Sequence, residues 1–252
     1  QALQQRQLRS VLNFQRTNHK TEAGLDLVQY RVEPGTLLPG SSSSVNYVKT
    51  PTENAYELSI HVDDELELNP DLALSAGLRY SQFLAMGPGI VRRYRPGEPL
   101  DELSALDSTL VGAGKVIKSY GGLEPRLGIR YALGPDASLK FGYNLMRQYL
   151  QQVTNTTTPL PTARWKTSDT YIRPQISQFL SAGYFRNFSQ NIYEFSAEVY
   201  YRATRNVVDY KPGADFLLQP FPETQLLQGQ SRAYGLELML TKKKGAMTGW
   251  LN

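Results

Sequence analysis

The residues best suited to bind a charged ligand lie in one stretch, Arg92, Arg93, Tyr94 and Arg95. Guanidinium groups beside a tyrosine suit a carboxylate or phosphate, because guanidinium donates paired hydrogen bonds to either anion. Farther along the chain, Trp165 stands between basic residues, where its indole can stack on a sugar or another ring. The alternatives are a solvated charged loop for the arginines, and a tryptophan that anchors its own loop. We treat all five residues as candidate ligand contacts.

Catalytic and metal chemistry find little support in the sequence. The chain has no cysteine and 2 histidines, His19 and His61, which are far apart. Zinc sites usually need about four ligands, mostly Cys and His, so neither a metal nor another cofactor is expected. The segment 112–115 resembles part of a phosphate-binding loop, but the upstream glycine is absent and Val116 stands where Ser or Thr is required. We predict that the protein is not an enzyme.

Composition narrows the class of protein. The chain has 252 residues, a net charge of +4 and a hydrophobic content of 40%. It contains no run of about 18 apolar residues, so it is not a bundle of membrane helices. Basic residues are interleaved with acidic ones and form no stripe, so we expect no nucleic-acid partner.

Alternation of apolar and polar residues is the strongest signal in the chain. Over 139–145 the odd positions are apolar and the even positions are polar or glycine, and the same period recurs at 56–63, 123–131, 193–202 and 234–241. A period of two predicts β-strands with one apolar face and one polar face. The sequence therefore predicts an all-β protein.

Short and long connections alternate between these strands. The short polar turns lie at 18–20, 69–71, 134–136, 187–190 and 243–245. The long connections lie at 34–54, 87–119, 152–173 and 211–228. In an antiparallel meander, this order puts every tight turn at one end and every long loop at the other. We expect about ten strands, many of about 11 to 15 residues, against about 5 to 6 in most globular proteins.

Long strands with one-sided loops predict an antiparallel up-and-down transmembrane β-barrel in the cell outer membrane. A sheet that spans lipid must close, which puts the apolar rows against outer-membrane lipid and the polar rows towards the lumen. The charged residues predicted to line the lumen are Glu57, Asp63, Arg126, Arg130, Lys140, Glu194, Glu198 and Glu237. Arg147 is expected on the lipid side near a strand end. Tyrosines expected in an interfacial girdle are Tyr80, Tyr131, Tyr149, Tyr193 and Tyr201.

A soluble sandwich or lipocalin-like barrel, with its apolar face inward, is the alternative.

Two phrases carry a resemblance to a known family. Residues 123–144 read LEPRLGIRYALGPDASLKFGYN, and residues 229–237 read GQSRAYGLE. Both resemble barrel strands of the TonB-dependent outer-membrane receptors, and the resemblance covers most of residues 55–252. It is closest to the branch related to the SusC-like glycan importers.

The resemblance implies a barrel of about 22 strands with an N-terminal plug in its lumen. It also implies a segment before the plug that contacts TonB, and energised uptake of a nutrient such as a siderophore, cobalamin, glycan or peptide. In the SusC-related branch the partners include a surface lipoprotein. The chain shows no plug-like stretch, so residues 1–252 are expected to be part of the β-barrel domain of a larger receptor.

Three functions remain open at this point. The first is TonB-energised import of a small-molecule or oligomeric nutrient. The second is a structural or assembly role, with a receptor-like barrel as a subunit of an outer-membrane complex. The third is passive diffusion through a porin-like channel.

Overall fold

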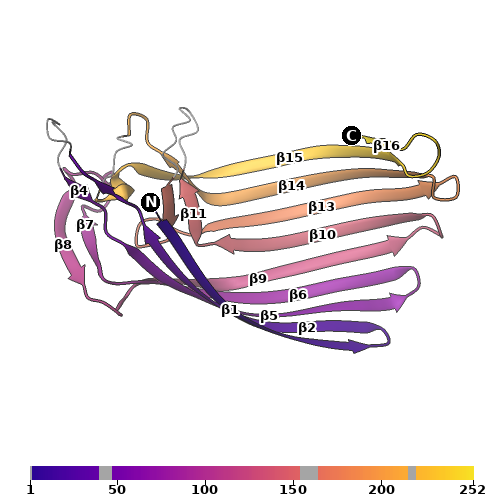
Figure 1. The fold of residues 1–252 in the computed structure, drawn as a ribbon, viewed down its shortest axis with the longest axis horizontal. Helices are drawn as coiled ribbons and strands as arrows, with labels where there is room; N and C mark the ends of the chain where they lie inside the picture. The colour runs from indigo at the N-terminus through magenta and orange to yellow at the C-terminus, as the bar shows by residue number, and fades with distance from the viewer. Residues whose placement is uncertain (1, 40–46, 154–163, 215–219) are drawn as a thin grey trace.

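The computed structural model describes residues 2–39, 47–153, 164–214 and 220–252. Ten strands form one antiparallel sheet in which chain neighbours pair, so the meander is up-and-down (Figure 1). In sheet order the strands are β1 (Ala2–Arg16), β2 (His19–Glu33), β5 (Glu53–Asn69), β6 (Leu72–Met86), β9 (Val116–Ala132), β10 (Ala137–Gln148), β13 (Gln175–Phe188), β14 (Tyr193–Tyr210), β15 (Leu226–Lys242) and β16 (Gly249–Leu251). The prediction of about ten antiparallel strands is confirmed.

The long connections carry structure of their own, which the sequence did not reveal. Three of them contain hairpins, and the fourth contains a short 3-10 helix. These elements are β3 (Thr36–Leu37) with β4 (Val48–Lys49), β7 (Gly89–Tyr94) with β8 (Ala105–Val111), β11 (Leu150–Val153) with β12 (Arg164–Thr167), and η1 (Pro222–Thr224). They gather at one end of the sheet, and the tight turns lie at the other (Figure 1). Within the described ranges, no helix is long and apolar enough to cross a membrane.

The predicted apolar rows lie together on one face of the sheet. Phe141 on β10 is directly opposite Ile129 on β9 and Ala182 on β13. Leu238 on β15 is opposite Ala197 on β14. These rows stay exposed, with half of Phe141 open to the surroundings, because no other layer in the described ranges covers them. An exposed apolar band on long strands is the outer surface of a membrane barrel.

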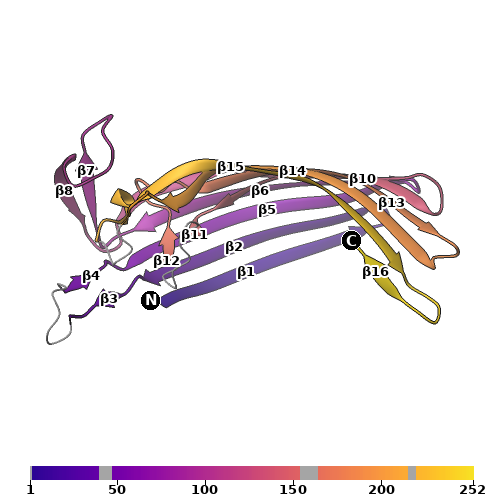
Figure 2. The ribbon, with the colours of Figure 1, turned by 90° about the horizontal axis from the view of Figure 1, so that it is seen from above.

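The other face is polar and concave. One cross-strand row runs from Arg130 through Lys140, Gly183 and Glu198 to Glu237. All eight charged residues of the predicted polar rows share this face. The sheet is curved in Figure 2, and the β11–β12 hairpin hangs on the inside of the curve, where β11 contacts β14 and β12 contacts β2 and β5. Among the described residues the edge strands β1 and β16 pair only with β2 and β15, so this sheet is open.

A small core fills the concave face next to the long connections. Its buried side chains include Val28, Tyr30 and Phe83, and Phe83 stacks on Tyr149 with ring centroids 4.8 Å apart. The girdle prediction for Tyr149 is therefore wrong. The strand β10 ends at Gln148 and the chain turns inward, so that Tyr149 is 2% exposed.

Arg147 also lies on the concave face, contrary to its predicted position on the lipid side. Its guanidinium sits over Gly122, where an added Cβ would come within 2.3 Å of the Arg147 Nη2 atom. Glycine at this position of β9 leaves room for the arginine to fold inward.

A charge on the apolar face is expected to destabilise the protein more than the same charge on the concave face. Leu238 and Met239 are neighbours on β15, are 50% and 42% exposed, and point to opposite faces. Leu238→Arg is expected to lower the free energy of unfolding by about 2 kcal/mol, because the guanidinium enters hydrocarbon, and Met239→Arg by less than about 1 kcal/mol. Urea titration of the full-length protein in phospholipid vesicles measures both losses. Equal losses would contradict the assignment of the two faces.

Candidate ligand-binding site

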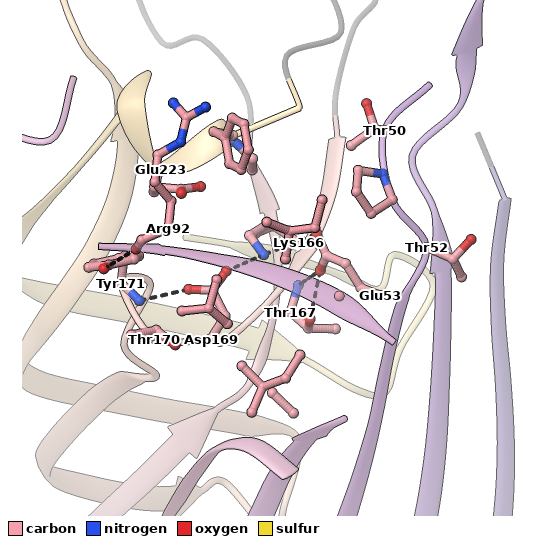
Figure 3. A pocket seen from close by; sticks show the side chains of 18 of the residues that line it. Thr50, Thr52, Glu53, Arg92, Lys166, Thr167, Asp169, Thr170, Tyr171 and Glu223 are labelled. Carbon is pink, nitrogen blue, oxygen red and sulfur yellow. Dashed lines mark hydrogen bonds and ion pairs between the residues drawn. The ribbon is translucent and has the colours of Figure 1, made fainter. Parts of the chain in front are cut away.

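A pocket of about 100 Å³ lies where the four long connections meet (Figure 3). Glu53 contributes from the start of β5 and Thr50 from the segment before it. The other walls come from Arg92 on β7, Lys166 on β12 and Glu223 on η1. Figure 3 shows Glu53, Lys166 and Asp169 side by side, with Arg92 and Tyr171 farther along the wall. The pocket is thus assembled from segments that are distant in the sequence.

A buried ion cluster fixes one wall. Lys166 is 3% exposed, and its Nζ donates to Glu53 Oε1 at 3.0 Å and pairs with Asp169 Oδ2 at 2.6 Å. The backbone N–H and the hydroxyl of Thr167 both donate to Glu53 Oε2, at 2.8 and 2.6 Å. Burial opposes the charged form of Lys166, but Asp169 and Glu53 outweigh it and raise the pKa of the amine. These contacts join β12 to the start of β5.

A second buried pair closes the wall formed by η1. The Tyr94 hydroxyl donates to Glu223 Oε1 at 2.9 Å, and the ring of Tyr171 meets Tyr94 edge-on with centroids 5.2 Å apart. Burial raises the pKa of the Glu223 carboxyl above its usual value. Burial, together with the charge of Glu223, also raises the pKa of the Tyr94 phenol, so Tyr94 keeps its proton and remains the donor. Tyr94 thus ties the β7–β8 hairpin to the β14–β15 connection.

Arg92 is the predicted arginine that lines the pocket. Its Cζ lies 3.5 Å from the centroid of the Phe221 ring, and its Nη1 donates to Glu102 Oε2 at 2.7 Å. Its backbone carbonyl accepts a hydrogen bond from the hydroxyl of Tyr171. Arg92 and Tyr94 are two positions apart on β7 and therefore share a face of that strand.

The structure does not bring the other two arginines to the same place. Arg93 points to the opposite face of β7 and donates to both oxygens of Asp107, through Nε at 2.8 Å and Nη2 at 2.5 Å. Arg95 lies beyond the strand and pairs with Glu98 at 3.6 Å. Trp165 is half-buried in the β11–β12 hairpin, outside the pocket lining.

The concave face holds a polar network that the sequence did not reveal. Arg79 on β6 donates to Glu57 Oε1 at 2.8 Å and to Glu124 Oε2 at 3.1 Å. The Ser81 hydroxyl donates to the other Glu124 oxygen at 2.5 Å, and Tyr30 donates to Glu57 Oε2 at 3.0 Å. Glu57 was predicted on this face, but Arg79 and Glu124 become its partners only through the register of β5, β6 and β9. The sequence could have identified Arg79 and Glu124 as partners of Glu57 only if the pairing register of these three strands had been known.

The remaining residues of the predicted polar rows make fewer contacts. Asp63 reaches Arg126 at 3.8 Å across Gly77, where a Cβ would lie 1.8 Å from the Asp63 carboxylate. Glu194 pairs with Lys243 at 2.6 Å. The Lys140 amine lies 4.3 Å from the centroid of the Phe185 ring.

Both histidines pair with carboxylates on the sheet. His19 Nδ1 lies 3.0 Å from Asp64 Oδ2, and His61 Nε2 lies 3.3 Å from Glu22 Oε1. Within the described ranges, no group of three or more His, Cys, Asp or Glu side chains is placed to hold a metal ion.

Long antiparallel strands with one apolar face, tight turns at one end and large structured connections at the other define an outer-membrane β-barrel fold. Comparison with known families identifies the particular one. The model of the family described as "TonB dependent receptor-like, beta-barrel" matches residues 3–251, and the chain belongs to this family.

Solved structures share the fold at low sequence identity. The FrpB iron transporter from Neisseria meningitidis is 11% identical with a TM-score of 0.63, and the match covers 98% of this chain and 35% of that one. The ferric-catecholate import receptor Fiu from E. coli K12 is 14% identical with a TM-score of 0.53, covering 97% and 36%. The Serratia marcescens hemophore receptor HasR is 16% identical with a TM-score of 0.55, covering 96% and 39%.

The chain therefore spans little more than a third of the length of these structures. A comparison with curated proteins finds no match.

Loss of the Glu53 carboxylate is expected to loosen the β10–β13 connection. Glu53→Gln leaves buried Lys166 with one carboxylate and weakens the acceptor for Thr167, so local opening should become easier by about 2 kcal/mol. Amide hydrogens of segment 164–173 should then exchange about thirtyfold faster. Hydrogen–deuterium exchange of the full-length protein, read by mass spectrometry, measures this.

The matched control makes the same chemical change in an exposed ion pair. Asp107→Asn removes the partner of Arg93, both side chains being more than half exposed, and should change exchange in 164–173 by less than about twofold. Unchanged exchange in Glu53→Gln would show that the ion cluster does not hold the connection.

Proposed function

We propose that the chain is part of the β-barrel domain of an outer-membrane receptor that imports a nutrient ligand with energy supplied through TonB. The observation that carries this proposal is the pocket at the loop end of a family barrel, with walls held by buried contacts among four connections. A scaffold role does not require such a pocket. A passive channel does not require loops fixed across the concave face.

We propose that the concave face lines the lumen and faces a plug domain outside residues 1–252. The charges of the cross-strand row support this. Arg130 lies opposite Lys140, and Glu198 lies opposite Glu237. Like charges that face each other across strands destabilise a sheet unless another group neutralises them. A polar plug against this face would supply groups that neutralise these charges, in a closed barrel of about 22 strands.

The identity of the ligand is a separate step of the proposal. FrpB is described as an iron transporter, Fiu as a ferric-catecholate import receptor, and HasR as a receptor in complex with a hemophore and heme. By analogy, we propose that this protein takes up a nutrient ligand such as a ferric siderophore or heme. Membership of the SusC-related branch, with a surface lipoprotein partner, remains a prediction that rests on the sequence phrases alone.

Growth experiments in the source bacterium test the function. A strain without the receptor gene should fail to grow on at least one sole nutrient from a panel of ferric siderophores, heme, cobalamin, oligosaccharides and peptides. Growth should return with the intact gene, but not when TonB is also deleted. Receptor-dependent growth that persists without TonB would favour a passive channel and contradict energised import. Unchanged growth on the whole panel would also count against import.

A further inference from the structure

Among the described residues, two cations line the pocket, and their surroundings differ. Lys166 is held between two carboxylates, at 3.0 Å from Glu53 and 2.6 Å from Asp169, in a side chain only 4% exposed. Arg92 is 16% exposed and is paired with Glu102, whose side chain is 71% exposed. The charge of Lys166 is thus neutralised inside the protein. The charge of Arg92 is balanced by a carboxylate at the surface.

The Arg92–Glu102 pair is easily exchanged for another pair. Glu102 lies in the turn of the β7–β8 hairpin and is mostly exposed, so its carboxylate can turn into water and remain solvated when it leaves Arg92. Arg92 stays in the pocket wall when Glu102 leaves, because its guanidinium lies against the Phe221 ring and its backbone carbonyl accepts a hydrogen bond from Tyr171. An incoming anion would therefore meet a guanidinium that is already in place.

The lining and the volume of the pocket limit the kind and size of chemical group that can carry the anion. Ile90, Phe221 and the flanking Pro220 and Pro222 give the lining an apolar side near Arg92, and Thr170 and Tyr171 add hydroxyl groups. The pocket volume of about 100 Å³ is well below the roughly 300 to 1,000 Å³ of sites that enclose a whole drug-sized ligand. It has room for one end group, and the remainder of a larger ligand would lie outside.

We propose that the pocket binds the anionic end group of the imported ligand, a carboxylate or phosphate carried on a small apolar or aromatic unit, with Arg92 as its anion contact. Glu102 is the counter-charge that leaves when the ligand enters. The proposal rests on the proposed receptor function and names the ligand class at its binding site.

The acidic residues of the pocket do not oppose this occupant strongly. The carboxylates of Glu53 and Asp169 face Lys166, and Glu223 accepts a hydrogen bond from Tyr94. Each of these carboxylates therefore has a donor of its own within the protein.

Binding of small probes to the full-length receptor in detergent tests the proposal. Benzoate and phenyl phosphate are the anionic probes, and benzamide is the uncharged probe of similar shape. Saturation-transfer NMR titration should show saturable binding of at least one anion and much weaker binding of benzamide. Comparison of the two anions shows which source of negative charge the site prefers. If wild type binds neither anion saturably, or binds benzamide as tightly, the proposal is wrong.

Three variants locate the anion. Arg92→Met should weaken binding of the preferred anion by about tenfold, the effect of a lost charge-assisted pair. Glu102→Gln should strengthen it about threefold or more, because the competing carboxylate is gone. Arg93→Met, on the opposite face of the same strand, is the matched control and should leave affinity unchanged.

A misfolded variant loses affinity but does not gain it, so the Glu102→Gln result separates the proposal from a folding defect. Equal losses in Arg92→Met and Arg93→Met, or no gain in Glu102→Gln, would overturn it. Binding in detergent does not involve TonB. Failure here is therefore distinguishable from failure of energised import.

Discussion

Lipid offers no hydrogen-bond partner to a peptide group, and this constraint governs the whole chain. Each strand that crosses a bilayer must pair its backbone with neighbouring strands. Nine of the ten strands in this sheet are therefore long, from the 12 residues of β10 to the 18 of β14. Pairing also fixes the register, because a slip of one residue would turn every apolar row towards the concave face. The two faces are thus a consequence of backbone pairing.

The long connections are held by side chains instead of by a continuous ladder. Lys166 reaches Glu53 on β5, Tyr94 reaches Glu223 on η1, and Tyr149 packs against Phe83. Each contact buries a polar or aromatic group with its partner, and a small buried apolar cluster of Val153, Ile172 and Leu226 adds to them. Since these contacts lie at the edge of the concave face, the connections bend over that face, as β11 and β12 do in Figure 2.

The sequence predicted what depends on local pattern and missed what depends on register. Alternation over 139–145 was enough to assign the faces of β10, since each residue's side follows from its neighbour. That rule stops at Gln148, where β10 ends, and Tyr149 was misplaced for this reason. Arg147 lies within β10 and was misplaced because its guanidinium folds over Gly122 of β9, a contact that alternation along one strand does not reveal. Partners such as Lys166 and Glu53, 113 positions apart, meet only after the strands have paired. The arginines 92, 93 and 95 looked like one cluster until β7 placed neighbours on opposite faces.

The sheet and the connections depend on different residues. The residues that keep the sheet in the membrane, such as Phe141 and Leu238, lie far from the pocket along the strands. Arg92 and Glu102 belong to the β7–β8 hairpin, which is a separate two-stranded sheet and not part of the ten-stranded one. In the proposed site, exchanging their charges would alter which ligand is attracted without changing the apolar area of the sheet. Binding specificity and membrane stability can therefore vary independently, because different contacts determine them.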